Sequence, residues 1–132
     1  MSRELFWLTL TAAMTGLLWL PYILDRVQTR GLMAAMDNPK PTDPPQSDWA
    51  ERQMRAHANA VENLTVFATL VLVAHALGIS NGVTAGAAMV YFWARLAHYV
   101  VYTMGLPIVR TLSFAVGWMA MAAYVLAIFK VI

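Results

Sequence analysis

Charged residues and cysteine are what this chain of 132 residues has least of. Only 12% of its residues are Asp, Glu, Lys or Arg, and 60% are hydrophobic, whereas roughly a quarter of the residues in an ordinary soluble domain are charged. The absence of cysteine excludes a disulfide framework, a thiol nucleophile and thiolate metal sites. A formal net charge of +2 is too small to indicate a nucleic-acid partner.

Stretches without any charged residue occupy most of the chain. They are residues 5–24, 63–94, 96–109 and 111–129. Because about 20 apolar residues cross the hydrocarbon core of a bilayer as a helix, the pattern predicts an all-α membrane protein, a bundle of four transmembrane helices in one domain over residues 1–132. No room remains for a separate soluble domain, so any chemistry must lie on the helices or in the first loop.

Prolines and a capping pattern divide the chain into helices. Residues 37–47 contain four prolines and no apolar periodicity, which indicates an exposed loop. Asp48, followed three residues later by Glu51, fits a capping box and predicts a helix start at residue 47 or 48. Pro21 predicts a kink or local unwinding in the first helix. We expect helices over about residues 4–30, 48–78, 83–105 and 109–130.

Basic residues are concentrated on one side of the predicted membrane. The other side has only Arg3 and Lys130. By the positive-inside rule, we expect the proline-rich loop of this multi-pass chain to lie in the cytoplasm and both termini to lie outside. The residues on the basic side are Arg26, Arg30, Lys40, Arg52, Arg55 and Arg110.

Polar residues recur at helical spacing within the second and third helices. Ionisable groups in membrane spans are costly and usually face the bundle interior. An ion pair between Glu62 and Arg95 is the most economical way to hide both charges, and we predict it. The second helix carries Arg55, Asn59 and Glu62, and the third carries Tyr91, Arg95, His98 and Tyr102.

Each of these groups also has a structural interpretation. Asp48 and Arg52, like Glu51 and Arg55, are acid-to-base pairs at i, i+4 spacing, which is typical of a solvated charged face. A pair between Glu62 and an arginine can be purely architectural.

Histidines and Arg110 leave alternatives open as well. His57 and His98 fit hydrogen-bonded structural histidines, and no histidine has metal-ligand spacing to another ligand, so we expect no metal. Arg110 opens a helix at the membrane surface, either as a snorkelling residue or as an electropositive site at a helix N-terminus. Ser113 and Gly117 form a small-x-x-x-small pair suited to close helix contact.

Two blocks of the sequence resemble the MAPEG family, the membrane-associated proteins in eicosanoid and glutathione metabolism. They are ERQMRAHANAVENLTVF at residues 51–67 and ARLAHYVVYTMGLPIVRTLSFAVGW at residues 94–118. The chain resembles a bacterial member of the microsomal glutathione transferase type. The resemblance implies a four-helix bundle that forms a homotrimer, with glutathione as co-substrate bound between neighbouring protomers near the cytoplasmic face.

The resemblance also assigns roles to residues. Arg110 matches the arginine thought to stabilise the glutathione thiolate, and Thr111 follows at a position near the chemistry. The positions implied in glutathione binding are Arg55, His57, Asn59, Glu62, Arg95, His98 and Tyr102, with Arg26 and Arg30 as further candidates for binding a carboxylate.

Three functions are compatible with these features. The first is a glutathione-dependent transferase or peroxidase that acts on lipophilic electrophiles or lipid hydroperoxides within the bilayer. The second is a non-enzymatic membrane scaffold or accessory subunit that retains the fold. The third is a protein that binds a lipid or quinone-like molecule.

Overall fold

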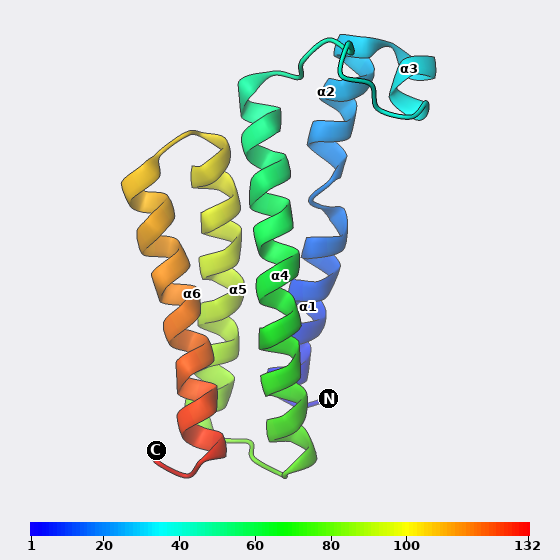
Figure 1. The fold of residues 1–132 in the computed structure, drawn as a ribbon. Coiled ribbons are helices and arrows are strands. Elements are labelled where there is room, and N and C mark those ends of the chain that lie inside the picture. The colour runs from blue at the N-terminus through cyan, green and yellow to red at the C-terminus, as the bar shows by residue number, and fades with distance from the viewer.

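Four helical columns run alongside one another in the computed structural model, which describes all 132 residues (Figure 1). Both termini lie at one end of the bundle, and α3 and the proline-rich loop lie at the other. The helices are α1 (Arg3–Leu17), α2 (Leu20–Arg30), α3 (Leu32–Met36), α4 (Asp48–Ala76), α5 (Gly82–Thr103) and α6 (Pro107–Ile128).

The first column is interrupted within the predicted helix over residues 4–30, close to Pro21, where the sequence predicts a kink or local unwinding. Helix α1 ends at Leu17 and α2 begins at Leu20. Pro21 has no backbone N–H and removes a helical hydrogen bond, which is the local unwinding that the sequence predicts. The hydroxyl of Tyr99, on α5, donates to the carbonyl of Leu18 at 2.9 Å. A neighbouring helix therefore provides a donor at the break, as a bilayer interior requires.

Three helical stretches are long and apolar enough to cross a membrane. They are Arg3–Arg30, Asp48–Ala76 and Pro107–Ile128. Helix α5 is also long, but Arg95 and His98 lower its hydropathy. It runs beside α6 over its whole length and also packs against α4 and α1.

Aromatic rings and small residues fill the core between α4, α5 and α6. The rings of Phe67 and Tyr91 stack with centroids 3.7 Å apart, and the hydroxyl of Tyr124 donates to the carbonyl of Thr84 at 3.0 Å. A Cβ atom at Gly117 would lie 3.4 Å from Cδ of Arg95. This is an ordinary van der Waals distance, so Gly117 packs closely against the aliphatic part of the Arg95 side chain.

The proline-rich loop is fastened to α2 by a buried carboxylate. Asp25 accepts hydrogen bonds from the backbone N–H of Ser47 at 3.0 Å, from the Ser47 hydroxyl and from the Gln46 amide at 3.3 Å. Ser47 is the N-cap of α4, and no side chain caps this helix. The predicted capping box of Asp48 and Glu51 is therefore wrong, because the serine at the cap position donates to another helix instead.

We expect the substitution Asp25→Ala to loosen this connection. It leaves the N–H and the hydroxyl of Ser47 without their acceptor, so the free energy of unfolding should fall by about 1–3 kcal/mol. Thermal unfolding in detergent and hydrogen exchange over residues 37–47 measure the effect.

Asp37→Ala is the matched control. Asp37 lies in the same region and pairs with Lys40 at 3.2 Å, but both side chains are largely exposed. Such a pair contributes little. An equal loss of stability in the two variants would contradict the role given to Asp25.

Candidate functional site

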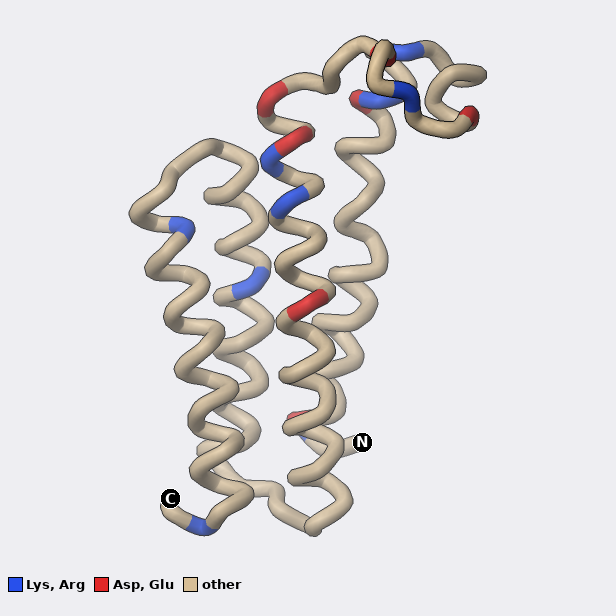
Figure 2. The backbone as a smooth tube through the Cα atoms, viewed as in Figure 1, with Lys and Arg blue, Asp and Glu red and all other residues tan.

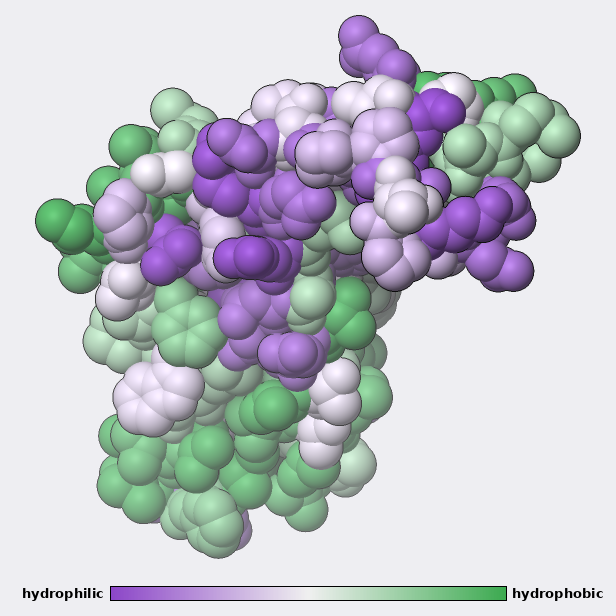
Figure 3. All heavy atoms as spheres, turned by 45° about the horizontal axis from the view of Figure 1, so that its top comes forward, coloured by the Kyte–Doolittle hydropathy of each residue, from purple (hydrophilic) through white to green (hydrophobic).

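Most charged residues lie toward the two ends of the bundle, and Glu62 and Arg95 lie between these ends. The end formed by the loop and the starts of α4 and α6 carries most of them, and the opposite end carries Arg3, Glu4 and Lys130 (Figure 2). In the space-filling view, hydrophilic residues cover the loop end and hydrophobic residues cover the body below it (Figure 3). The candidate site residues lie at the loop end and in the adjoining part of the bundle.

The predicted ion pair between Glu62 and Arg95 is wrong within this chain. Glu62 is exposed and forms no salt bridge, whereas Nη2 of Arg95 donates to Oδ1 of Asn59. Three residues along an α-helix correspond to a net rotation of about 60°. That difference is enough for Asn59 to face α5 while Glu62 faces outward.

Arg95 is enclosed without a countercharge. Its exposed fraction is 3%, its Nε atom has no hydrogen-bond partner, and its guanidinium lies 5.9 Å from the centroid of the Phe114 ring. The charge is thus contacted by Asn59 from α4 and by the ring of Phe114 from α6. A buried guanidinium with so few partners is expensive, so Asn59 is a structural partner of Arg95 in the single chain.

His98 lies one turn further along α5 and is also buried, with an exposed fraction of 3%. Its Nδ1 atom has no hydrogen-bond partner. Its ring centroid lies 5.6 Å from that of Tyr102 and 6.1 Å from that of Phe114. Arg95 and His98 therefore both pack against α6. Phe114 lies near both side chains, and Gly117 lies against Arg95.

Arg110 lies in the first turn of α6 and is half-buried. Its Cζ atom lies 4.6 Å from the centroid of the Tyr102 ring, which is a cation–π contact. The guanidinium forms no hydrogen bond or salt bridge within the chain. Thr111 is exposed, and its hydroxyl donates to the carbonyl of Pro107 at 3.0 Å.

The remaining α4 candidates divide between enclosed and exposed positions. Nδ1 of His57 lies 2.8 Å from the hydroxyl of Tyr22 and shares a hydrogen bond with it. Arg55 is exposed and has no partner within the chain, as is the case for Glu62. The spacing of Arg55, Asn59 and Glu62 thus does not place all three side chains in one environment.

Neither of the predicted i, i+4 ion pairs on α4 forms. Arg52 does not pair with Asp48, and Arg55 does not pair with Glu51. Nε of Arg52 instead donates to the carbonyl of Thr103 at 2.9 Å, which ties the start of α4 to the end of α5. Thr103 is the last residue of α5, so its carbonyl has no acceptor role within the helix and is available to Arg52.

Arg26 and Arg30 hold the loop. Nε of Arg26 donates to Oε1 of Gln46 at 3.1 Å, and Nε of Arg30 donates to the carbonyl of Pro44 at 2.9 Å. Arg30 also pairs with Asp43 at 3.7 Å. Their role in binding a carboxylate stays a prediction.

Sequence analysis missed the residues that position the loop end. Asp25, Gln46, Ser47 and Arg52 all make contacts between elements there. Asp25 directly follows an apolar run, and this position is a sign of its importance. Its partner Ser47 lies 22 residues away and could not be predicted from spacing. No group of three or more His, Asp or Glu side chains gathers where a metal ion could be held.

Fold and site together define an all-helical membrane protein whose candidate site residues lie toward the loop end of the bundle. A model of the MAPEG family matches residues 5–130. The chain therefore belongs to the MAPEG family, whose members use glutathione. No curated protein matches the sequence.

We expect Asn59→Ala to destabilise the fold more than Glu62→Ala does. The first variant removes the only hydrogen-bond acceptor of the buried Arg95 side chain, at a cost of about 1–3 kcal/mol. The second removes an exposed side chain that has no partner in the chain. Thermal unfolding of the two variants in the same detergent gives the comparison. A larger loss of stability for Glu62→Ala would instead support an ion pair between Glu62 and Arg95.

Proposed function

We propose that this protein is an integral membrane glutathione-dependent transferase or peroxidase, in which Arg110 stabilises the glutathione thiolate. The attacked molecule is a lipophilic electrophile or a lipid hydroperoxide that reaches the protein from the bilayer. Family membership supports the use of glutathione, and the surroundings of Arg110 support the role of this residue.

The observation that carries the proposal is an arginine that is accessible and without an anionic partner. Arg110 is half-buried, lies against the Tyr102 ring, and has no carboxylate within salt-bridge distance. It also lies in the first turn of α6, where the helix dipole favours an anion. Both features favour a thiolate over a thiol.

The electrostatic requirement is within the reach of one guanidinium. Lowering a thiol pKa from about 8.5 to about 6.5 requires about 2.7 kcal/mol of preference for the thiolate. A unit charge about 4 Å away, in an effective dielectric of about 20, provides about 4 kcal/mol before desolvation is subtracted. The attraction of one guanidinium is therefore of the same order as the requirement.

Glutathione also has two carboxylates and one ammonium group, which need partners of opposite charge. The exposed Arg55 guanidinium and Glu62 carboxylate supply one cation and one anion on the outer side of α4. Tyr102 is half-buried beside Arg110 and fits the glutathione-contacting position implied by the family motif. The proposed site also includes four more enclosed residues, of which His98 contacts the ring of Tyr102. They are His57, Asn59, Arg95 and His98.

The proposed assembly is a homotrimer of protomers that each cross the inner membrane four times, with α5 as the fourth span. Glu62 lies in the middle of α4, a helix long enough to cross the membrane, yet it is exposed. An exposed carboxylate at such a position is unfavourable in lipid, so a neighbouring protomer that covers it stabilises the membrane-inserted chain. The excess of basic residues at the loop end supports a cytoplasmic location for the site.

We expect the purified chain to have the mass of a trimer in native mass spectrometry from a mild detergent. Glu62→Leu should keep the helices but alter the proportion of trimer, because it changes the residue at the proposed contact. A wild-type chain that is monomeric at all concentrations tested would contradict the proposed assembly.

We expect Arg110→Ala to abolish the thiolate signal of bound glutathione. Ultraviolet absorbance of the thiolate, followed across pH with purified protein and glutathione, gives the apparent thiol pKa, which should return toward about 8.5 in this variant. Arg110→Lys should retain part of the signal, because it keeps the charge but not the planar donor group.

Lys40→Ala is the control, because it removes a cation from the same end of the molecule without touching the proposed site. Glutathione binding measured by calorimetry separates loss of binding from loss of thiol activation. An unchanged thiolate signal in Arg110→Ala would remove the proposed role of Arg110. Intact trimers that bind no glutathione would favour the scaffold function instead.

A further inference from the structure

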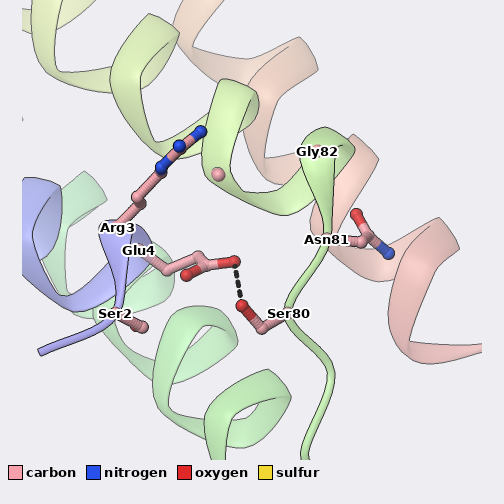
Figure 4. A pocket seen from close by; sticks show the side chains of 7 residues that line it. Ser2, Arg3, Glu4, Ser80, Asn81 and Gly82 are labelled. Carbon is pink, nitrogen blue, oxygen red and sulfur yellow. Dashed lines mark hydrogen bonds between the residues drawn. The ribbon is translucent and has the colours of Figure 1, made fainter.

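A polar cavity of about 250 Å³ lies at the end of the bundle opposite Arg110, between the start of α1 and the start of α5 (Figure 4). It is separate from the proposed glutathione site and does not depend on it. The residues around it include Ser2, Arg3, Glu4, Ser80, Asn81 and Gly82.

Glu4 gives this cavity a carboxylate without a countercharge. Its exposed fraction is 4%, and no basic group lies within 4.0 Å of it. Oε1 of Glu4 accepts hydrogen bonds from the hydroxyls of Ser80 at 3.0 Å and Thr84 at 2.7 Å. Both hydroxyls thus use the same oxygen of the carboxylate. A buried carboxylate is costly unless a cation or further donors compensate it.

The other wall of the cavity is electropositive. Arg3 is exposed and its guanidinium forms no salt bridge, and its side chain extends along α5, away from the Glu4 carboxylate. Gly82 is the first residue of α5, where backbone N–H groups have no acceptor in a preceding turn. Oδ1 of Asn81 accepts from the N–H groups of Val83 and Thr84, so the N–H of Gly82 remains for a ligand.

We propose that this cavity binds the phosphoethanolamine group of a phospholipid, with its ammonium on Glu4 and its phosphate on Arg3 and the N–H of Gly82. A carboxylate and an anion-binding wall in one small cavity match a ligand with both charges separated by two carbons. A helix N-terminus and a guanidinium are both suited to phosphate.

The position of the cavity favours a lipid as the source of this group. The stretch Arg3–Arg30 is apolar enough to cross a membrane and begins at the cavity, and the chain ends at the same end of the bundle. The headgroup region of the bilayer therefore lies at this level. A choline headgroup has the same phosphate, but its quaternary nitrogen has no N–H to donate to Glu4, so the cavity distinguishes the two.

Native mass spectrometry of the full chain in detergent tests the proposal, with phosphatidylethanolamine and phosphatidylcholine of identical acyl chains as probes. We expect the ethanolamine lipid to bind about tenfold more tightly, which corresponds to one charge-assisted hydrogen bond. Glu4→Gln should remove this preference while its amide oxygen still accepts from Ser80 and Thr84. Arg3→Gln should weaken both lipids, because it acts on the phosphate.

Glu51→Gln is the matched control, since it neutralises an exposed acid at the opposite end of the chain. Equal binding of the two lipids by the wild type, or an unchanged preference in a folded Glu4→Gln, would overturn the proposal. If Glu4→Gln does not fold, Arg3→Gln is the deciding variant, because Arg3 is exposed and its loss leaves the hydrogen bonds of Glu4 intact. Undiminished lipid binding by Arg3→Gln would overturn the proposal. Soluble phosphoethanolamine that displaces the lipid would support recognition of the headgroup alone, whereas displacement by phosphocholine at the same concentration would overturn it.

Discussion

The hydrogen bond from Arg95 to Asn59 is the interaction on which the arrangement of the other polar groups depends. The guanidinium is almost fully enclosed and has no carboxylate beside it. In an apolar interior a polar group without a partner is strongly unfavourable, so α4 must turn Asn59 toward α5. On the other side, Gly117 packs against the aliphatic part of the same side chain. One buried arginine thereby contacts both α4 and α6.

The rotation of α4 separates the polar residues into two classes. Asn59 and His98 face the inside of the bundle, whereas Arg55 and Glu62 face outward on a helix that is long enough to cross the membrane. The outward groups and Arg110 are available to a ligand or to a neighbouring protomer. This division explains why equal helical spacing along α4 does not mean an equal role.

Much of the fold follows from the sequence, because apolar length and the positions of proline and glycine determine the helices. The family motif also indicates Tyr102 and Arg110 as candidate site residues, and the two side chains are in contact in the structure. The partner of Arg95 could not be predicted in this way, since Asn59 and Glu62 differ by only a small rotation about one helix axis. The loop contacts of Asp25 were equally out of reach, because they join residues 22 apart through a segment with no periodicity.

The contacts at the loop end connect the loop to the candidate site through a single helix. Tyr22 accepts a hydrogen bond from Gln46 at its carbonyl and shares one with His57 at its hydroxyl. Asp25, less than one turn away, accepts from Ser47 at the start of α4. Because α2 begins directly after a break in the first column, it is joined to the rest of the chain by these bonds more than by a continuous helix. The position of α2 therefore determines where the loop lies relative to the start of α4.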